Sequence, residues 1–202
     1  MIALVDYDAG NVRSVEKAIV HLGAEPVLTR DIDTIRQADH VIVPGVGAFE
    51  DAMGRLQNYG LVEPLREIAA EGKPIMGICL GLQLFFEGSE ESANDVPGLA
   101  LLPGRLKRFP DTDGYKIPQI GWNALQIRSG SRLFKDVPDG TYVYFVHSYY
   151  LQAERESDVA ARATYMIPFD AAVERDNIFA TQFHPEKSGE SGLQILKNFI
   201  SI

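Results

Sequence analysis

Apolar and amphipathic segments alternate through the first half of the chain. Three segments are apolar almost throughout, which is typical of parallel strands that are buried on both faces. They are IALVDY at 2–7, HVIVPG at 40–45 and PIMGIC at 74–79. Two further segments, 11–23 and 61–72, repeat apolar positions at helical spacing and end in glycine, which suits the position just past a helix. The alternation predicts a parallel sheet with helices on both faces.

The second half of the chain has short β-strand patterns separated by turn residues. The predicted strands lie within residues 102–127, 141–153, 158–165, 171–177 and 178–186. The last predicted element is a helix at 191–200, with Ser188 or Ser191 as its cap. We therefore expect one α/β domain over residues 1–202: a mostly parallel central sheet flanked by helices, with an antiparallel β extension.

Composition narrows the class of protein. Hydrophobic residues make up 46% of the 202 residues and the formal net charge is -9, which argues against nucleic-acid binding because phosphate contacts need clustered Lys and Arg. No apolar run is long enough for a bilayer, and the start lacks the features of a signal peptide, so we expect a cytoplasmic protein. A single cysteine, Cys79, excludes an internal disulfide and a cysteine-based metal site.

Cys79 stands between two glycines in Gly77-Ile78-Cys79-Leu80-Gly81, where an apolar strand gives way to a predicted helix. This is the arrangement of a nucleophile elbow, with sulfur in place of the serine oxygen. Bulky neighbours two residues away on either side would clash, and the turn would hold the nucleophile in a strained backbone, exposed above the sheet. A helix N-terminus favours the thiolate, and the amide of Leu80 could stabilise an oxyanion. The alternative is a core thiol, since free cysteine is among the most buried residue types.

A thiol nucleophile needs a base, and the chain offers four histidines. His21 ends a predicted helix, His40 is expected at the surface, and His147 ends an apolar strand and stays ambiguous. His184 is the strongest candidate because Glu186 follows it in HPE, on the same side of a segment that Pro185 is expected to keep extended. A carboxylate there would hold the imidazole in one tautomer, completing a Cys–His–Glu triad.

The segment VIVPGVGAFE supplies a further element. Its predicted strand runs into Pro44-Gly45-Val46-Gly47, and a helix is expected from Ala48. Glycines keep side chains away and leave backbone N–H groups available to an anionic atom, so Val46 and Gly47 are candidates for the second half of an oxyanion hole. The alternative is a tight strand-to-helix turn with no chemical role.

Together these motifs resemble a known family. PGVGAF, GICLGLQLFFEGSEES, GWN, YVYFVHSYY and QFHPEKSG are similar to class I (triad) glutamine amidotransferases, and more narrowly to the glutaminase subunit of imidazole glycerol phosphate synthase. The resemblance spans the chain from DYDAGN to LKNF. It implies hydrolysis of glutamine to glutamate and ammonia in histidine biosynthesis, without a cofactor or metal.

The resemblance also implies roles for single residues. Cys79 would attack the side-chain amide of glutamine, His184 would move the proton, and Glu186 would orient His184. The backbone amides of Leu80, Val46 and Gly47 would hold the oxyanion. The implied substrate-binding residues are Gln83, Glu91, Ser148 and Tyr149, Glu91 as the partner of the substrate's ammonium group.

Because bulk water protonates ammonia, a useful glutaminase must pass it directly to an acceptor. The family implies a second subunit for this purpose, a (β/α)8-barrel cyclase that would form a heterodimer with the chain. Its candidate contacts are Asn11, Trp122, Tyr144 and Lys187.

The chain departs from the family pattern at two positions. Gln119 stands where many members have His, and Asp8 stands where Gly is frequent. Asp tolerates strained turn conformations better than most residues, so the N-terminal loop is expected to survive this change. Both departures are expected to alter fine contacts at the partner face.

Three other interpretations compete with this one. A glutaminase that serves another acceptor, as in pyridoxal phosphate synthesis, would share the elbow and HPE but not GWN and YFVHSY. A non-catalytic binding domain would have a degenerate triad, whereas Cys79, His184 and Glu186 are all intact. A DJ-1-like cysteine protein would lack HPE.

Overall fold

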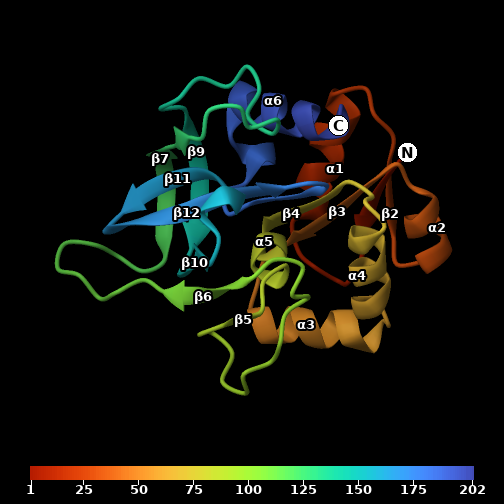
Figure 1. Cartoon of the computed structure of the whole chain (residues 1–202), viewed down its shortest axis with the longest axis horizontal. Helices are drawn as coiled ribbons and strands as arrows, with labels where there is room; N and C mark the ends of the chain where they lie inside the picture. Colours follow the sequence, from red (N-terminus) through yellow and green to blue (C-terminus); the bar gives the residue numbers. More distant parts are fainter.

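The fold, described from a computed structural model that covers residues 1–202, is an α/β arrangement around one large sheet (Figure 1). The helices are α1 (Val12–His21), α2 (Ile32–Gln37), α3 (Phe49–Asn58), α4 (Val62–Ala70), α5 (Leu80–Leu84) and α6 (Gly189–Ile200). The strands of the first half are β1 (Ile2–Val5), β2 (Pro26–Thr29), β3 (His40–Gly45), β4 (Ile75–Cys79) and β5 (Gly88–Ser89). Those of the second half are β6 (Gly104–Arg108), β7 (Gln119–Ala124), β8 (Gln126–Ile127), β9 (Tyr142–His147), β10 (Tyr149–Ala153), β11 (Val159–Tyr165), β12 (Ile167–Arg175) and β13 (Ile178–Thr181).

The large sheet has two parts that differ in strand direction. Its order is β2-β1-β3-β4-β13-β12-β10-β6-β5; β11 also pairs with β12, and β8 pairs with β11. The strands from β2 to β13 are parallel. The pairs β13–β12, β12–β10, β10–β6 and β12–β11 are antiparallel, and the short edge strand β5 pairs with β6 in parallel. The predicted fold class, a mostly parallel central sheet with an antiparallel extension, is confirmed.

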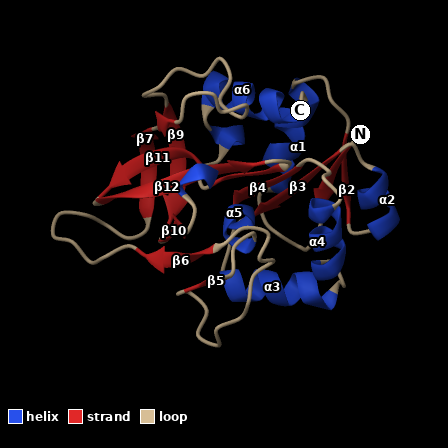
Figure 2. Ribbon diagram, viewed as in Figure 1, coloured by secondary structure: helices blue, strands red, loops and turns tan.

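Helices cover both faces of the parallel part (Figure 2). The buried faces of α1 and α6 pack on one side, with Ile19 and Phe199 fully enclosed. Helices α2, α3, α4 and α5 pack on the other side, around Phe49 and Leu65. The apolar spacing of α1 and α4 is what places these side chains against the sheet. As predicted, the glycines after these two helices, Gly23 and Gly72, have positive φ angles of 79° and 86°.

Three elements of the first half escaped prediction: β2, α2 and the two-residue strand β5. Strand β2 is a four-residue edge strand that begins with proline and is only half-buried, so its apolar pattern is weak. Helix α2 is a six-residue helix with a single buried residue, Ile35. Short elements with little buried surface carry little periodic signal.

A separate two-stranded sheet, β7–β9, lies beside the large one and ends next to the active site. Its antiparallel register places Ile120 opposite Val146 and Trp122 opposite Tyr144. The alternate residues point inward, and Phe145 and His147 pack with Phe169. Strand β9 thereby places His147 and the following Ser148 at one wall of the site.

The end of the chain differs from the prediction in two details. Ser188 is the residue before α6, but its side chain makes no capping bond there; its hydroxyl donates to the carbonyl of His184 and accepts from the amide of Tyr144. His40 is not a surface residue: its ring is partly buried against Phe199, and burial lowers its pKa.

Candidate active site

The junction between β4 and α5 has the elbow geometry that the two glycines predict. Cys79 has φ 55° and ψ -105°, a conformation rarely adopted by L-residues. A Cβ on Gly77 would lie 2.5 Å from the carbonyl oxygen of Gly81, and a Cβ on Gly81 would lie 1.8 Å from that of Val43. Only glycine fits at either position, so the predicted steric reason for both is confirmed.

Two expectations about this junction need correction. The thiol is not exposed above the sheet, because Cys79 is only 5% exposed and lies at the floor of a cavity. Helix α5 has only five residues, Leu80–Leu84, so its dipole is far weaker than that of a long helix. The local backbone N–H of Leu80 is therefore more important for the electrostatics at Cys79 than the helix as a whole.

His184 and Glu186 are brought together by a turn and not by an extended segment. Residues Pro185–Lys187 form a single 3₁₀ turn after His184, so the predicted extended geometry is wrong. Proline suits the first position of such a turn because its missing N–H would have no partner there. The turn folds the carboxylate back, and the Nδ1–H of His184 donates to Glu186 Oε1 at 2.8 Å. The two side chains are 1% and 0% exposed.

The environment of His184 favours its charged form. Burial acts to lower the pKa of His184, but hydrogen bonding and charge from Cys79 and Glu186 outweigh burial and raise it to about 9. Its Nε2 is buried without a partner of good hydrogen-bond geometry. The thiol of Cys79 and the carboxylate of Glu186 thus both act on one imidazole and favour its charged form.

Asn11, which was predicted only as a partner contact, also reaches the buried carboxylate. It precedes α1 with φ 66° and makes no side-chain capping bond. Instead its Nδ2 donates to Glu186 Oε1 at 2.7 Å. Asn11 and His184 therefore share one oxygen of Glu186.

The candidate oxyanion segment lies directly beside the thiol. In the parallel pairing of β3 with β4, Gly45 stands opposite Cys79, so Val46 and Gly47 follow at the edge of the cavity. The buried Tyr7 holds the strand end, since its hydroxyl donates to the carbonyl of Pro44 at 2.6 Å. Burial, with a smaller contribution from the charge of Cys79, raises the pKa of Tyr7, which keeps it a neutral donor.

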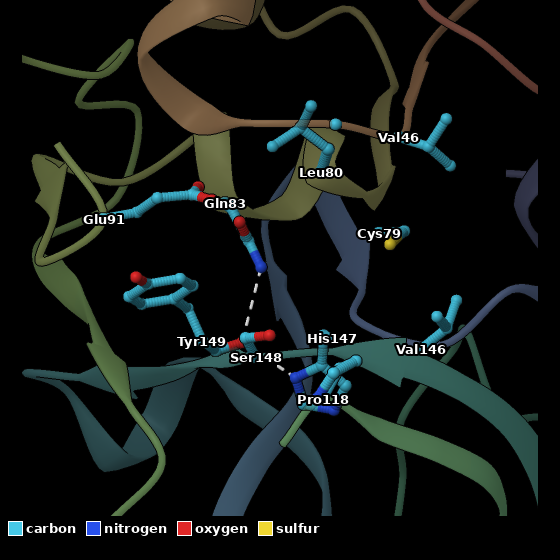
Figure 3. Close-up of a pocket in the computed structure, with 11 residues that line it drawn as sticks. Val46, Cys79, Leu80, Gln83, Glu91, Pro118, Val146, His147, Ser148 and Tyr149 are labelled. Atoms are coloured by element: carbon cyan, nitrogen blue, oxygen red, sulfur yellow. Dashed lines mark hydrogen bonds between the residues drawn. The ribbon is translucent and has the colours of Figure 1, made fainter.

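A cavity of about 250 Å³ opens above Cys79, and the predicted substrate contacts line its walls (Figure 3). Cys79, Leu80 and Gln83 come from one wall, and Ser148 and Tyr149 from the facing one. The amide of Gln83 points across the cavity and donates to the carbonyl of Tyr149 at 3.4 Å. All four predicted substrate-binding residues, Gln83, Glu91, Ser148 and Tyr149, lie on this cavity.

Glu91 has a structural contact in addition to its place on the cavity wall. Its Oε2 accepts from the backbone N–H of Phe49 at 2.8 Å, at the first turn of α3. No cation of the chain forms an ion pair with it. The hydrogen bond from the start of α3 thus keeps the carboxylate of Glu91 at the cavity, where no cationic side chain of the protein neutralises it.

His147 is a buried neutral imidazole behind the facing wall. It is 6% exposed, and its Nδ1–H donates to the carbonyl of Tyr149 at 2.7 Å. Burial lowers the pKa of His147 to about 4, with a smaller contribution from the charge of His184. Its lowered pKa and its bond to Tyr149 argue against His147 as a base, so His184 stays the stronger candidate.

The sequence reasoning missed Gln182. It is fully buried just after β13, and its Nε2 donates to the sulfur of Cys79 at 3.8 Å. Its Oε1 accepts from the Nε2 of Gln83 at 3.1 Å. The signal was present in the sequence, since a glutamine interrupts the apolar run IFATQF.

The four predicted partner contacts lie around the outer side of the triad. Tyr144 lies 6.5 Å from the ring of His184 and 6.0 Å from that of Trp122. Lys187 is exposed on the same turn as Glu186, and Asn11 touches that carboxylate. They form a strip of neighbouring residues, while their role in docking stays a prediction.

The two departures from the family pattern fit the fold. Asp8 has φ 59°, and its carboxylate accepts from Arg30 at 2.7 Å and from the hydroxyl of Tyr59. Gln119 is buried and donates to Asn123 at 2.7 Å. No group of three or more His, Cys, Asp or Glu is placed to hold a metal ion, and none of the helices combines the length and apolar character needed to cross a bilayer.

Comparison with known families agrees with this geometry. The family described as "Glutamine amidotransferase class-I" matches residues 3–202. The chain belongs to the class-I glutamine amidotransferase family. Within it, the chain is similar to proteins named "Imidazole glycerol phosphate synthase subunit HisH". The relative from Moorella thermoacetica is 49% identical over 198 residues, 98% of this chain and 93% of the relative. The one from Thermosynechococcus vestitus is 48% identical over 203 residues, covering 100% and 96%.

Solved structures of this family share the fold. One described as "Crystal structure of glutamine amidotransferase" superposes with a TM-score of 0.75 at 20% identity, covering 100% of this chain and 98% of the other. The structure of PurLQS from Thermotoga maritima gives a TM-score of 0.75 at 21% identity, covering 99% and 97%. The arrangement of sheet and flanking helices described above is therefore shared with these structures.

Proposed function

We propose that this glutamine amidotransferase hydrolyses the side-chain amide of glutamine with Cys79 as nucleophile, His184 as acid and base, and Glu186 as the group that orients His184. The observation that carries the proposal is the environment of the buried imidazole of His184. Glu186 binds its Nδ1–H, and Cys79 and Glu186 together outweigh burial and raise its pKa to about 9. At neutral pH such an imidazole is protonated and has a proton to give to the leaving nitrogen, which a cysteine-dependent amide hydrolysis needs.

In the first half of the reaction the thiolate of Cys79 attacks the amide carbon of glutamine. The carbonyl oxygen becomes an oxyanion, which the backbone N–H groups of Leu80 and of Val46 or Gly47 are placed to receive. The imidazolium of His184 gives its proton to the nitrogen as the C–N bond breaks. Ammonia leaves, and a thioester remains on Cys79.

In the second half a water molecule attacks the thioester. The now neutral His184 takes one proton from the water, and the oxygen adds to the carbonyl carbon. Collapse of the second tetrahedral intermediate releases glutamate and restores the thiolate of Cys79 beside the imidazolium. The chain supplies both proton transfers, so no cofactor is required.

The size and charge of the cavity support an amino-acid substrate. A volume of about 250 Å³ is smaller than that of pockets for drug-sized ligands, which begin at roughly 300 Å³. Glu91, which has no counter-charge in the chain, would bind the α-ammonium group of glutamine. Backbone groups of Ser148 and Tyr149 would bind the opposite end of its backbone, and Gln83 would contact the substrate from the nucleophile's side.

We further propose that the ammonia passes to a (β/α)8-barrel cyclase subunit in the cytoplasm, for the synthesis of imidazole glycerol phosphate in histidine biosynthesis. The relatives are named as subunits of a synthase, which supports a partner chain. The outer face of β7–β9 supports it physically: Ile120, Trp122 and Tyr142 are 64%, 52% and 62% exposed. A large apolar surface of this kind is typical of a docking site, and tryptophan is a frequent anchor residue.

The decisive experiment measures glutamine hydrolysis by the chain alone and with the barrel cyclase and its nucleotide ligand. We expect faster hydrolysis in the ligand-bound complex, and equal rates would contradict the partner. The variant Cys79→Ala should lose glutamine-dependent activity by at least about a thousandfold, because the nucleophile is absent. The same complex should still use added ammonium salts, which controls for folding and docking. Glutaminase activity retained by Cys79→Ala would refute the triad.

A further inference from the structure

Gln182 is a buried polar side chain whose only side-chain partners are in the active site. It is 0% exposed, and its backbone N–H is bound to Ala171 at 2.8 Å, so the main chain is fixed by the sheet. Its side chain contacts Cys79 through Nε2 and Gln83 through Oε1. Because a buried amide needs hydrogen-bond partners, these two contacts are what make a glutamine side chain tolerable at this buried position.

The direction of these hydrogen bonds follows from the carbonyl of Tyr149, where the series of contacts from Cys79 through Gln182 and Gln83 ends. The carbonyl of Tyr149 can only accept, and it receives the Nδ1–H of His147 and the Nε2–H of Gln83. The NH₂ group of Gln83 therefore faces Gln182, which must answer with its oxygen. The NH₂ group of Gln182 is then left facing the sulfur of Cys79.

A donor directed at this sulfur acts differently in each state of the reaction. A hydrogen bond to an ionised acceptor is roughly twice as strong as one to a neutral acceptor. The N–H of Gln182 therefore stabilises the thiolate of Cys79 more than the thiol. The same amide fixes the rotamer of Gln83, whose side chain projects into the cavity.

We propose that Gln182 is a positioning residue of the glutaminase reaction, which orients the thiolate of Cys79 and the side chain of Gln83 through one buried amide. The proposal rests on the proposed function of the site. The proposal predicts two separate effects. Loss of the N–H donor of Gln182 should lower the reactivity of Cys79. Loss of its oxygen acceptor should release the side chain of Gln83 and thereby weaken substrate binding.

Two substitutions test these effects separately. Gln182→Met keeps the volume but removes both donor and acceptor, so we expect glutamine kcat/KM to fall about ten- to hundredfold. Gln182→Glu keeps an oxygen for Gln83 but turns an acceptor toward the sulfur. In that variant KM should stay near the wild-type value while kcat falls. Both are measured by steady-state glutamine hydrolysis with the ligand-bound cyclase.

The second measurement is the rate of Cys79 alkylation by iodoacetamide as a function of pH, with the full chain alone. The pH midpoint should move upward by about one unit in Gln182→Met and further in Gln182→Glu, because the thiolate loses its donor and then faces a carboxylate. The matched control is Gln119→Met, which removes another buried glutamine amide, bound to Asn123. It should lower stability without moving the midpoint.

A wild-type midpoint and wild-type kcat in both Gln182 variants would overturn the proposal, as would an equal midpoint shift in Gln119→Met. If Gln182→Met fails to fold, as judged by circular dichroism, Gln182→Glu decides alone. Failure of the proposed function is a separate result. A wild-type chain that never hydrolyses glutamine would refute that function, whereas the alkylation profiles would still report whether Gln182 acts on Cys79.

Discussion

Two strand-to-helix junctions meet at the active site, and the rest of the fold constrains them to very different degrees. At the β4–α5 junction, a Cβ on Gly81 would lie 1.8 Å from a backbone oxygen, and Cys79 is 5% exposed. At the β3–α3 junction Val46 is 38% exposed, and a Cβ on Gly47 would meet nothing within 4 Å. Backbone packs tightly around the glycines of the first junction, whereas the second junction is open from Val46 onward, although a Cβ on Gly45 just before it would lie 2.0 Å from the hydroxyl of Tyr7.

The two junctions therefore have different roles in the site. A close-packed interior holds one geometry, so the thiol of Cys79 is oriented by the fold itself. The amides at Val46 and Gly47 are oriented mainly by their own loop, where glycine has many backbone conformations available. The nucleophile is therefore expected to be ready in the isolated chain, while the oxyanion side is where a docked partner can act.

The sharpest test of this comparison replaces one glycine at each junction by alanine. Gly81→Ala forces the backbone of β3 or α5 to shift, so we expect a loss of about 3 kcal/mol in the free energy of unfolding. Misplacing the nucleophile should also lower glutamine hydrolysis by at least about a hundredfold. Gly47→Ala meets no steric obstacle but has φ 117°, so its stability cost should be about 1 kcal/mol.

The two variants should differ most in the reactivity of the thiol. Alkylation of Cys79 by iodoacetamide should be slow in Gly81→Ala and close to wild type in Gly47→Ala. Glutamine hydrolysis should fall in both, because the oxyanion is formed only in that reaction. If Gly47→Ala slowed alkylation as much as Gly81→Ala does, the two junctions would not be independent.

The enclosed side of the site should also respond to acid. The folded-state pKa of His147 is about 4, below its ordinary value of about 6.5, so the unfolded chain binds more protons between these pH values. Stability is then present above pH 6.5 and lost as the pH falls toward 4. Between pH 7 and 4.5 the loss from His147 should be about 2 to 3 kcal/mol. His184 does not add to it, because its raised pKa acts between 6.5 and about 9.

Urea unfolding at pH 7 and 4.5 measures this loss, compared with the variant His147→Gln. Titration of carboxylates is common to both proteins and cancels in the difference. His21→Gln is the control, since it removes an exposed histidine on α1, and it should leave the acid loss unchanged. An equal acid loss in wild type and His147→Gln would show that the ring is not held neutral.

The sequence predicted the nucleophile side of the site better than its surroundings, and the reason is local. The elbow motif lies within five consecutive residues, so Gly77 and Gly81 are enough to predict it, although the backbone that excludes a Cβ on Gly81 is that of Val43 in β3. The hydrogen bonds from Asn11 to Glu186 and from Gln182 to Cys79 join residues 175 and 103 positions apart. No spacing rule reaches across such distances without the fold.

The same limit explains the wrong prediction at HPE. Pro185 is compatible both with an extended segment and with the first position of a 3₁₀ turn. The choice is made by tertiary contacts: Ser188 donates to the carbonyl of His184 at 2.6 Å and ties the turn to β9 through the amide of Tyr144. The pairing of His184 with Glu186 was therefore predicted correctly, but the backbone conformation assumed for it was wrong.

The smallest expected effect concerns the loop that touches both sides of the site. Its Gly10 is packed so closely on Val46 that a Cβ would lie 2.8 Å from it, and its Asn11 donates to Glu186. Asn11→Ala removes one charge-assisted hydrogen bond from a half-buried place, so we expect glutamine kcat to fall about tenfold with little change in KM. Asn11→Asp should lower it further, because an acceptor would then face Glu186.

Steady-state glutamine hydrolysis in the ligand-bound complex measures both variants. The control is Arg13→Ala, since Arg13 is 81% exposed on the same helix and pairs only with Glu16. If both Asn11 variants kept the wild-type kcat and merely bound the cyclase more weakly, Asn11 would serve docking alone. Asn11 is the only residue besides His184 that binds the carboxylate of Glu186. A lower kcat at saturating cyclase would therefore show that the loop couples the position of Val46, on the open side of the site, to the orientation of the His184–Glu186 pair.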